Sequence, residues 1–400
     1  MKPHTVVQIN TTCGVGSTGK ICVSISEVLS KEEIDNYILY SSASNGYSKG
    51  IPCCKRHYTR IQSIKSHIIG NYGFNSQNET LKMISELDRI MPDAVLIHNI
   101  HGHDCNLTML FSYFKDKHIK LFWTFHDCWA FTAYCTHFIY EGCEKWKTGC
   151  NNCKLRNSSS WFFDRSDELY RRKRDLFLGL DLTIITPSQW LADLVKQSFL
   201  KQYPVMVIHN GIDLSVFCPT RSDFRERNNI RDDQYMLLGV AYNWGKKKGL
   251  DQFIKLSERL DQERFKIVLV GTNDKVDKSL SDNIISIHRT QDAKALAEIY
   301  TSADLLVNPT REDNFPTVNL EALACGTPVV TFKTGGSPEC VDESCGFVVP
   351  VDDYASLEST IINEMIQRSI NTEDCLRRSR LFDKNRCFEN YVKLLTRSKI

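Results

Sequence analysis

The chain has 400 residues, with 42% hydrophobic and 24% charged residues and a formal net charge of +2. The length suits two domains, the composition excludes a disordered chain, and a charge this close to zero gives no support to nucleic-acid binding. The start MKPHTVVQIN lacks the apolar run of a secretion signal, and no stretch approaches the roughly 20 apolar residues of a membrane span, so we expect a cytoplasmic protein.

Short apolar runs alternate with helical patterns along the whole chain. In the first half the runs are 5–9, 36–42, 93–100, 120–127, 182–188 and 204–213, and after a polar linker they resume at 235–243, 265–271, 283–289, 304–310 and 328–333. This order predicts two α/β domains with parallel sheets.

We place the N-terminal domain at 1–212 and the C-terminal domain at 213–400, and we expect the last helix to pack back on the first domain. Ligands of open parallel sheets bind beyond the carboxyl ends of the strands, and two such domains facing each other make a cleft.

The turn after the first run contains a partial phosphate-binding pattern. Gly14, Gly19 and Lys20 fit G-x-x-x-x-G-K, but a magnesium-ATP site needs Ser or Thr at the position of Ile21. The turn is therefore either a phosphate-side loop without magnesium chemistry or a tight turn that requires glycine.

The segment TREDNFPTVNLEALACGTPVV, residues 310–330, is the most informative. Acidic residues follow a strand, and Pro316 is favoured as the first residue of the next helix. The N–H groups of Thr317 and Val318 would then be free to hold a phosphate, and Glu321, about one turn further on, could reach sugar hydroxyls. This combination favours a sugar nucleotide; the alternative is an acidic loop before a buried helix.

Here the sequence resembles the family 4 glycosyltransferases of the bacterial surface-polysaccharide type, which are retaining enzymes of the GT-B fold with an E-x7-E motif. The resemblance covers nearly the whole chain and includes TPSQWL (186–191), IHNGID (208–213) and GGSPE (335–339). The second glutamate of the motif is Glu321, whereas the first falls on Asp313, next to Glu312. Which of these two acids contacts the donor sugar stays open.

The resemblance implies the following roles. Glu321 binds the ribose hydroxyls of the donor, Lys248 binds its diphosphate, and His126 is the active-site histidine near the transferred sugar. Because the usual arginine of the phosphate site is Asn243 here, Lys246 or Lys247 would compensate. The expected catalytic residues are His126, Asp313 and Glu321, and the expected donor-binding residues are Gly16, Ser17, Thr18, Gly19, Lys248, Asn314, Phe315, Pro316, Thr317, Val318 and Glu321.

Further histidines precede the expected active-site histidine. His98, His101 and His103 are too loosely spaced, without a cysteine pair, to indicate a metal site. We interpret His98 and His101, together with Asp127, as acceptor-side residues.

The chain contains no Asp-x-Asp pair of the kind that metal-dependent transferases use. We therefore expect transfer without a metal cofactor, with a UDP or GDP sugar as donor, because helix N-termini and lysines can stabilise the leaving diphosphate.

Sixteen cysteines in a chain without a secretion signal favour reduced thiols or metal over a disulfide scaffold. In a cysteine-rich insertion at about 126–153, Cys150 and Cys153 have the spacing of a metal knuckle. Cys135, Cys143, Cys150 and Cys153 are candidate ligands of a structural zinc; the alternatives are packed thiols or a disulfide.

Residues 161–180 mix aromatic side chains with Arg171, Arg172, Lys173 and Arg174. The mixture fits peripheral contact with the cytoplasmic face of an inner membrane that holds a lipid-linked acceptor. A solvated helix face is the alternative.

Together these features predict a retaining glycosyltransferase that acts on a lipid-linked oligosaccharide or glycan acceptor in O-antigen or exopolysaccharide synthesis, with no nucleic acid as partner. The alternatives are a sugar-nucleotide 2-epimerase on the same fold and a non-catalytic sugar-nucleotide binding protein.

Overall fold

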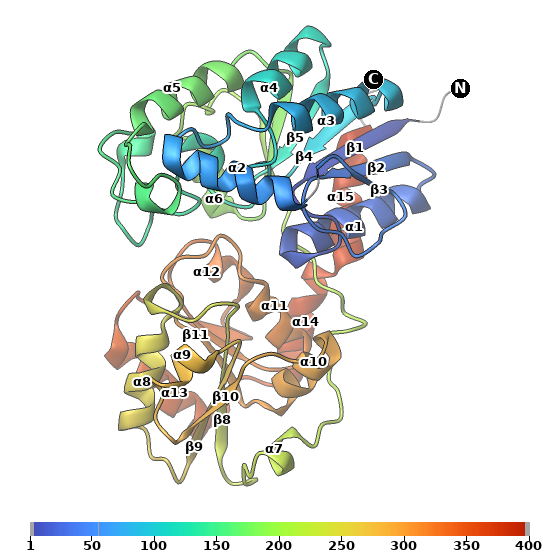
Figure 1. Cartoon of the computed structure of the whole chain (residues 1–400). Coiled ribbons are helices and arrows are strands. Elements are labelled where there is room, and N and C mark those ends of the chain that lie inside the picture. The colour runs from blue at the N-terminus through green and yellow to red at the C-terminus, as the bar shows by residue number, and fades with distance from the viewer. Residues whose placement is uncertain (1–3, 55, 397–400) are drawn as a thin grey trace. The chain divides into compact units, whose positions relative to one another are not determined.

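The computed structural model describes residues 4–54 and 56–396 (Figure 1). The chain divides into two compact units. Unit 1 comprises Met1–His209 and Cys387–Ile400, and unit 2 comprises Asn210–Arg386.

Unit 1 is built on a seven-stranded parallel sheet with strand order β3-β2-β1-β4-β5-β6-β7. The strands are β1 (Thr5–Asn10), β2 (Asp35–Tyr40), β3 (Gly50–Pro52), β4 (Ala94–Ile97), β5 (Lys120–Thr124), β6 (Leu182–Thr186) and β7 (Val205–Val207). The sequence did not predict β3, because its three residues Gly-Ile-Pro carry no strand pattern.

Helices cover both faces of this sheet (Figure 1). They are α1 (Gly16–Lys31), α2 (Arg56–Ile69), α3 (Gln77–Ile90), α4 (Leu107–Asp116), α5 (Ser166–Phe177), α6 (Gln189–Val195) and α15 (Lys384–Thr396). One face packs against α3, α4, α5 and α6, and the other packs against α1 and α15. The hydroxyl groups of Tyr391 on α15 and Thr124 on β5 are 3.2 Å apart, so the last helix belongs to the core of unit 1.

Unit 2 repeats the plan with a six-stranded parallel sheet of order β10-β9-β8-β11-β12-β13. Its strands are β8 (Tyr235–Val240), β9 (Phe265–Val270), β10 (Ile284–Ile287), β11 (Leu305–Asn308), β12 (Val329–Phe332) and β13 (Gly346–Val349). Its helices are α7 (Phe224–Arg227), α8 (Leu250–Arg259), α9 (Asp274–Asp277), α10 (Ala293–Ser302), α11 (Thr317–Ala324), α12 (Ser337–Cys340), α13 (Tyr354–Gln367) and α14 (Thr372–Ser379).

The helices of unit 2 also form two layers. Helices α10, α11 and α14 pack on one face of the sheet, and α8 and α13 pack on the other. Because both faces are covered, the strands are apolar on both sides, which is why they stand out in the sequence as continuous apolar runs. The prediction of two parallel-sheet α/β domains is confirmed.

The strand order reverses once in each sheet. In unit 1 the chain runs outward from β1 to β3 and then returns to β4, on the other side of β1; in unit 2 it does the same around β8 and β11. In open α/β sheets this reversal leaves a crevice at the carboxyl ends of the central strands, where ligands bind. The loops after β1, β4, β8 and β11 therefore lie where ligands of such sheets bind.

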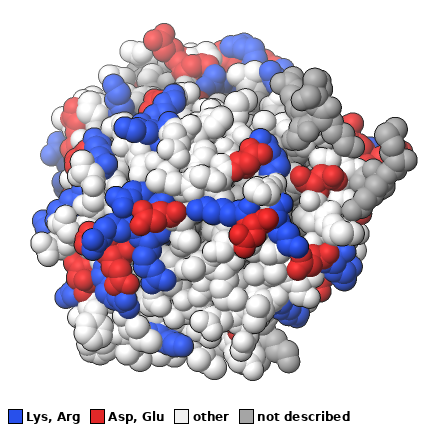
Figure 2. Space-filling model, turned by 90° about the horizontal axis from the view of Figure 1, so that it is seen from above, with Lys and Arg blue, Asp and Glu red and all other residues white. Residues whose placement is uncertain are grey.

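Acidic and basic side chains lie side by side on the face drawn in Figure 2. In the part of the chain that the structure describes, every helix is too short or too polar to cross a membrane.

Candidate active site

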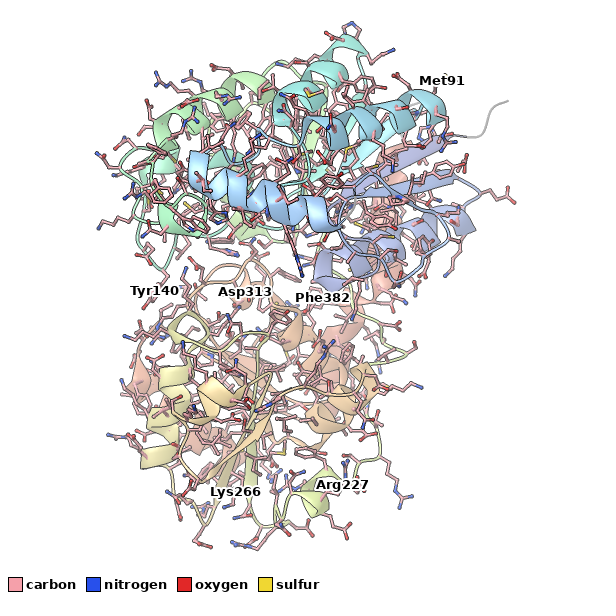
Figure 3. All side chains as sticks on the ribbon, viewed as in Figure 1. Met91, Tyr140, Arg227, Lys266, Asp313 and Phe382 are labelled. Atoms are coloured by element: carbon pink, nitrogen blue, oxygen red, sulfur yellow. The ribbon has the colours of Figure 1, made fainter. Side chains whose placement is uncertain are left out.

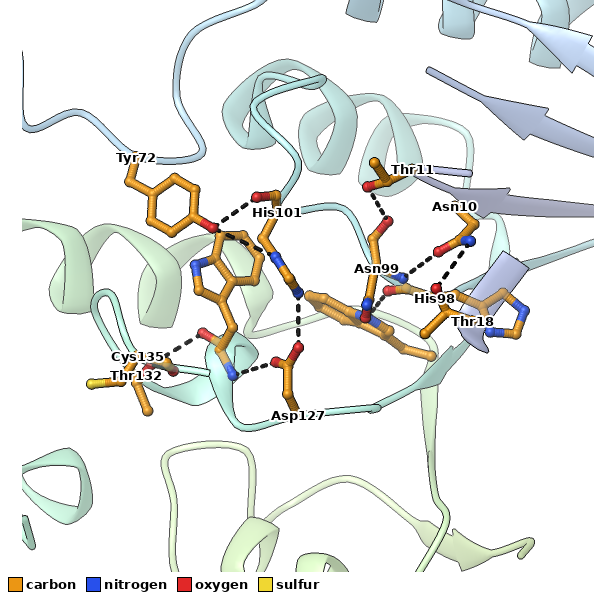
Figure 4. A network of polar contacts seen from close by, with 12 residues as sticks. Asn10, Thr11, Thr18, Tyr72, His98, Asn99, His101, Asp127, Thr132 and Cys135 are labelled. Atoms are coloured by element: carbon orange, nitrogen blue, oxygen red, sulfur yellow. Dashed lines mark hydrogen bonds and ion pairs between the residues drawn. The ribbon is translucent and has the colours of Figure 1, made fainter. Parts of the chain in front are cut away.

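Four of the predicted residues of unit 1 meet at the carboxyl edge of its sheet, and Figure 4 shows His98, His101 and Asp127 among them. His98 and His101 follow β4, and His126 and Asp127 follow β5, the neighbouring strand. His98 is buried, whereas His126 and Asp127 are partly exposed. The edge of the sheet thus presents imidazole and carboxylate groups on a rigid support.

A hydrogen-bond chain fixes the tautomer of His126. Gln8 Nε2 donates to the carbonyl of Cys22 at 3.0 Å, so Gln8 Oε1 faces His98 and accepts its Nε2–H at 3.0 Å. The Nδ1 atom of His98 is then an acceptor, and Nε2 of His126 donates to it across 3.1 Å. Neutral His126 therefore carries its proton on Nε2 and has its lone pair on Nδ1.

Burial keeps both of these imidazoles neutral. It lowers the pKa of His126 to about 4, and together with the neighbouring His126 it lowers the pKa of His98 well below its usual value. A charged form of either ring would lose hydration that the protein does not replace.

His101 and Asp127 form an ion pair, with 2.8 Å between Nε2 and Oδ2. Burial opposes charge on both groups, but the attraction between them outweighs it, so the pKa of His101 is raised and that of Asp127 is lowered. The backbone N–H of Trp129 donates to the other Asp127 oxygen at 2.8 Å, and Tyr72 donates to the carbonyl of His101 at 2.7 Å.

The glycine-rich loop lies beside these histidines. Helix α1 begins at Gly16, so Gly16, Ser17 and Thr18 form its first turn. Asn10 at the end of β1 connects the two segments, because its side chain donates to Thr18 Oγ1 at 3.4 Å and accepts from the N–H of Asn99 at 3.1 Å. Gly19 has no room for a side chain: an added Cβ would lie 2.7 Å from the hydroxyl of Thr12.

In unit 2, two lysines pair with two acids. Lys246–Lys248 form a short 3-10 helix after β8. Lys247 Nζ lies 2.6 Å from Glu312 and Lys248 Nζ lies 2.6 Å from Asp313 in the loop after β11. The carboxylate side chain of Glu312 is 4% exposed and that of Asp313 is 23% exposed, so Asp313 is the more accessible acid. Asp313 is labelled in Figure 3.

Arg311 holds this loop in place and was missed by the sequence reasoning. Its buried guanidinium pairs with Asp251 at 2.7 Å and also with Asp352, and it donates to the carbonyl of Lys246. The two carboxylates outweigh burial and raise the pKa of Arg311. The backbone of Gly335 lies directly against this loop, since an added Cβ there would overlap the backbone carbonyl of Asp313. The loop with Arg311, Glu312 and Asp313 is therefore held against the 3-10 helix Lys246–Lys248.

Helix α11 begins at Thr317, one residue later than the sequence predicted, with Pro316 as the capping residue instead of the first helical residue. Proline has no N–H to lose in either position, which is why a one-residue error is easy here. Among the described residues no side chain caps this helix end, so the N–H groups of Thr317 and Val318 point out of the first turn.

Glu321 lies one turn into α11. The phenol of Tyr300 on α10 donates to its Oε2 at 3.0 Å. Tyr300 is fully buried and its pKa is raised well above its usual value by burial and by Glu321, so it stays a donor. Neither Tyr300 nor Gln8 carried a sequence signal, because each acts through a partner that is distant in the chain.

The four candidate zinc ligands line one cavity of about 180 Å³ on unit 1. Lys173, which the sequence placed on a basic helix face, is instead fully buried beneath this region. Its Nζ donates to the carbonyls of Trp129, Thr132 and Ala133 at 2.8, 3.0 and 3.3 Å. The expectation of a solvated or membrane-facing Lys173 is therefore wrong.

Two parallel-sheet units of this kind in one chain define the GT-B class of glycosyltransferases. The structure is similar to a sucrose-phosphate synthase of Thermosynechococcus elongatus, with a TM-score of 0.71 at 14% identity over 98% of both chains. It is also similar to HepE of Anabaena in complex with UDP-glucose, with a TM-score of 0.69 at 13% identity over 98% of this chain and 99% of that one.

Two glycosyltransferase family models match the sequence, one on each unit. Residues 22–216 match Glycosyltransferase Family 4, and residues 234–365 match Glycosyl transferases group 1. An Escherichia coli protein assigned to colanic acid biosynthesis as the glycosyl transferase WcaC is 24% identical over 394 residues, which cover 92% of each chain. The two models together span most of the chain, which carries a Glycosyltransferase Family 4 domain and a Glycosyl transferases group 1 domain and is a glycosyltransferase.

Proposed function

We propose that this protein transfers a sugar, with retention of anomeric configuration and without a metal ion, from a nucleoside-diphosphate sugar to a growing surface polysaccharide. Donor binding is inferred from a group of charged side chains in unit 2 that lies next to the start of α11. Lys247 and Lys248 lie against Glu312 and Asp313, directly before a helix whose N-terminus no described side chain caps.

This grouping suits a diphosphate. When the bond between the anomeric carbon and the diphosphate breaks, the leaving oxygen gains negative charge. The N–H groups of Thr317 and Val318 and the ammonium of Lys248 can stabilise that charge without a metal, since helix N-termini attract anions. Lys248 pairs with Asp313; we propose that the donor's diphosphate takes over this cation on binding and that Asp313 turns to the sugar.

Glu321 is proposed to bind the ribose of the donor. Its Oε2 atom accepts a hydrogen bond from Tyr300, which orients the carboxylate, and a carboxylate can accept several hydrogen bonds at once, including those of ribose hydroxyls. With retention, the acceptor hydroxyl bonds to the anomeric carbon on the face from which the diphosphate departs, and its proton passes to the leaving diphosphate oxygen.

Unit 1 is proposed to contribute His126 to the transfer step, with His101 and Asp127 on the acceptor side and Gly16, Ser17, Thr18 and Gly19 near the phosphates. His98, expected on the acceptor side, is buried with both ring nitrogens bonded to Gln8 and His126, so it is proposed to act through His126. The supporting observation is that Gln8 and His98 hold His126 in one tautomer. A group held in one orientation before the substrate arrives loses little entropy on binding.

The relatives suggest the substrate class. HepE binds UDP-glucose, and the E. coli relative is assigned to colanic acid biosynthesis. We therefore propose a UDP sugar as donor and a lipid-linked or polysaccharide acceptor of exopolysaccharide or O-antigen type.

A surface on unit 1 supports peripheral membrane contact, which would bring the enzyme to a lipid-linked acceptor. The ring of Trp161 packs on that of His67 in α2, with ring centroids 5.1 Å apart. The backbone N–H of Trp161 also donates to the backbone carbonyl of His67 at 2.8 Å. Exposed apolar side chains therefore gather where the two segments meet, with Phe162 65% exposed. The members of this surface are Tyr58, Ile61, Ile64, Ile68, Trp161, Phe162 and Phe163.

The test is a donor-turnover assay in EDTA with UDP sugars, with and without undecaprenyl-diphosphate-linked saccharide. We expect release of UDP only when the acceptor is present, and an α-linked product from an α-linked donor by NMR. Conversion of the UDP sugar into its C2 epimer without any acceptor would instead indicate the 2-epimerase, and an inverted product or a metal requirement would contradict the proposal.

A further inference from the structure

Four cysteines from separate turns of the loop between β5 and α5 face one cavity. Cys135, Cys143, Cys150 and Cys153 all line the 180 Å³ cavity, together with the rings of Phe138 and Trp146. The side chains of Cys135 and Cys153 are hydrogen-bonded to each other; Cys135 also interacts electrostatically with Cys143 and Cys150, and Cys150 with Cys143 and Cys153. Cysteines that only fill separate positions of a hydrophobic core are not expected to line one cavity together.

The backbone turns that carry the thiols have the form of metal knuckles. Asn152, between Cys150 and Cys153, has φ of +43°, and Gly142, directly before Cys143, has φ of +60°. These left-handed residues turn the chain so that the next sulfur points back into the cavity. The backbone amide of Leu155 lies against the Cys153 sulfur, and that of Ala133 lies against the Cys150 sulfur.

The charge beneath the cavity points to an anionic occupant. Lys173 Nζ uses its hydrogen bonds on three neutral carbonyls, a number that fits the three protons of an ammonium. The carboxylate that interacts with it electrostatically, Asp127, is already paired with His101. Burial lowers the pKa of Lys173 well below its usual value, so a charged Lys173 needs a counter-charge, which Cys135 and Cys150 would supply as metal-bound thiolates.

We propose that Cys135, Cys143, Cys150 and Cys153 bind one structural Zn²⁺ as four thiolates. The four thiol protons pass to solvent as the metal binds, and the thiolates leave a surplus of negative charge that a protonated Lys173 offsets in part. Zinc is the ion that a closed set of four cysteine sulfurs selects among common cellular divalent metals.

Metal binding must draw the sulfurs together. In a tetrahedral site with Zn–S bonds of about 2.3 Å, the sulfurs are about 3.8 Å apart. In the described parts of the chain, Asp274, Asp277 and His288 form the only group of three or more His, Cys, Asp or Glu ligand atoms that all lie within 4.8 Å of one another, so no three of the four cysteine sulfurs are that close together. The cavity gives the turns room to close around the ion.

The proposed zinc site would stiffen the loop between β5 and α5, which also carries His126 and Asp127. The hydroxyl of Thr132 donates to the carbonyl of Cys135 at 2.6 Å, and the Trp129 N–H donates to Asp127, which pairs with His101 (Figure 4). The inference does not depend on the proposed transfer reaction, because zinc binding can be measured without substrate.

The experiment is metal analysis of the tag-free wild-type protein, purified without chelator, by elemental analysis and native mass spectrometry. We expect about one zinc per chain, as a closed four-cysteine site predicts. Replacement of zinc by Co²⁺ should give thiolate-to-cobalt charge-transfer absorption. Cys143→Ser and Cys153→Ser should each lose the metal, and zinc removal should lower the thermal midpoint.

Two control variants make the result specific. Cys54→Ser changes a half-buried cysteine of unit 1 outside the cavity, and Asp277→Asn changes the exposed group around His288; both should keep the zinc. Wild-type protein with less than about a tenth of a zinc per chain and four reactive thiols would overturn the proposal. So would a disulfide among the four cysteines, or zinc that is lost in Asp277→Asn but kept in Cys153→Ser.

Discussion

At the scale of single residues, the position of the proton on His126 depends on the side chains to which it is linked by hydrogen bonds. The proton on His126 Nε2 follows from the side-chain amide of Gln8, two hydrogen bonds away. Gln8 is fully buried in β1, where a polar side chain is tolerated only because both ends of its amide are hydrogen-bonded.

His126→Ala should reduce kcat for transfer while leaving the Kd for the donor nucleotide within about twofold, since the proposed role of His126 is in the transfer step. General acid–base or electrostatic groups of this kind contribute about 10²-fold or more to the rate. His118→Asn, a change at an exposed turn of the same unit, is the matched control. A parallel loss of donor affinity in His126→Ala would assign His126 to binding instead.

Glu321→Gln should weaken donor binding, because hydrogen bonds to a charged group are worth about 1.5–3 kcal/mol, or at least about tenfold in Kd. Tyr300→Phe should weaken it less, since it removes the partner that orients Glu321 and not the carboxylate itself. Titration calorimetry with UDP measures both. Equal affinities in all three proteins would show that the ribose lies elsewhere.

The pH dependence of stability follows from the neutral histidines. An unfolded histidine binds a proton near pH 6.5, whereas folded His126 binds one at about pH 4. Between these values the unfolded chain holds more protons, so the free energy of unfolding falls as the pH falls. His101 acts in the opposite sense, because its raised pKa adds stability below about pH 6.5 that is lost as the pH rises.

We expect the thermal midpoint of the wild type to fall between pH 6.5 and pH 4, and to fall less in His126→Asn, which has no titrating ring in this position. Scanning calorimetry at several pH values gives the comparison. An equal fall in both proteins would mean that His126 is not held neutral by the fold.

At the scale of elements, the start of α11 is the part of unit 2 on which diphosphate binding depends. Pro316 has φ of −72° and ψ of 110°, which is the extended backbone that precedes a proline. Thr317 is the first helical residue, where proline is tolerated. Thr317→Pro therefore removes one N–H and leaves the helix in place.

Thr317→Pro should keep the thermal midpoint of the protein without nucleotide and weaken UDP binding by about tenfold, the value of one hydrogen bond to a charged group. Thr317→Ala keeps the N–H and should bind nearly as well as the wild type. If the proline variant binds UDP normally, the phosphates do not use this helix end.

At the scale of the whole molecule, the parallel sheets were predictable from the sequence, whereas the hydrogen bonds and ion pairs that hold the site residues in place were not. Strands such as β4 and β11 are buried on both faces, so their apolar residues are contiguous in sequence. The three-residue β3 lacks that signal. The ends of elements were predicted less well, as at Pro316, because the same residue suits two neighbouring positions of a helix start.

The same limit applies to the candidate site. His126, Asp313 and Glu321 follow from motifs at the ends of strands. Arg311 and Tyr300 act through residues that are brought together only by the fold, across 60 and 21 positions of the chain. Lys173 gave a misleading signal, because three neighbouring arginines suggested an exposed basic face while its own side chain is buried.

The central claim is that unit 2 binds a nucleoside diphosphate without metal, and the most direct measurement is a thermal-shift titration in EDTA. The panel would contain UDP, GDP, ADP, dTDP and CMP, tested on the wild type, Glu321→Ala and Lys248→Ala. We predict a saturable rise in the thermal midpoint of the wild type with UDP, reduced in both variants, since a ligand that binds only the folded state stabilises it. The absence of a shift with every nucleotide, or shifts that persist unchanged in both variants, would contradict the account.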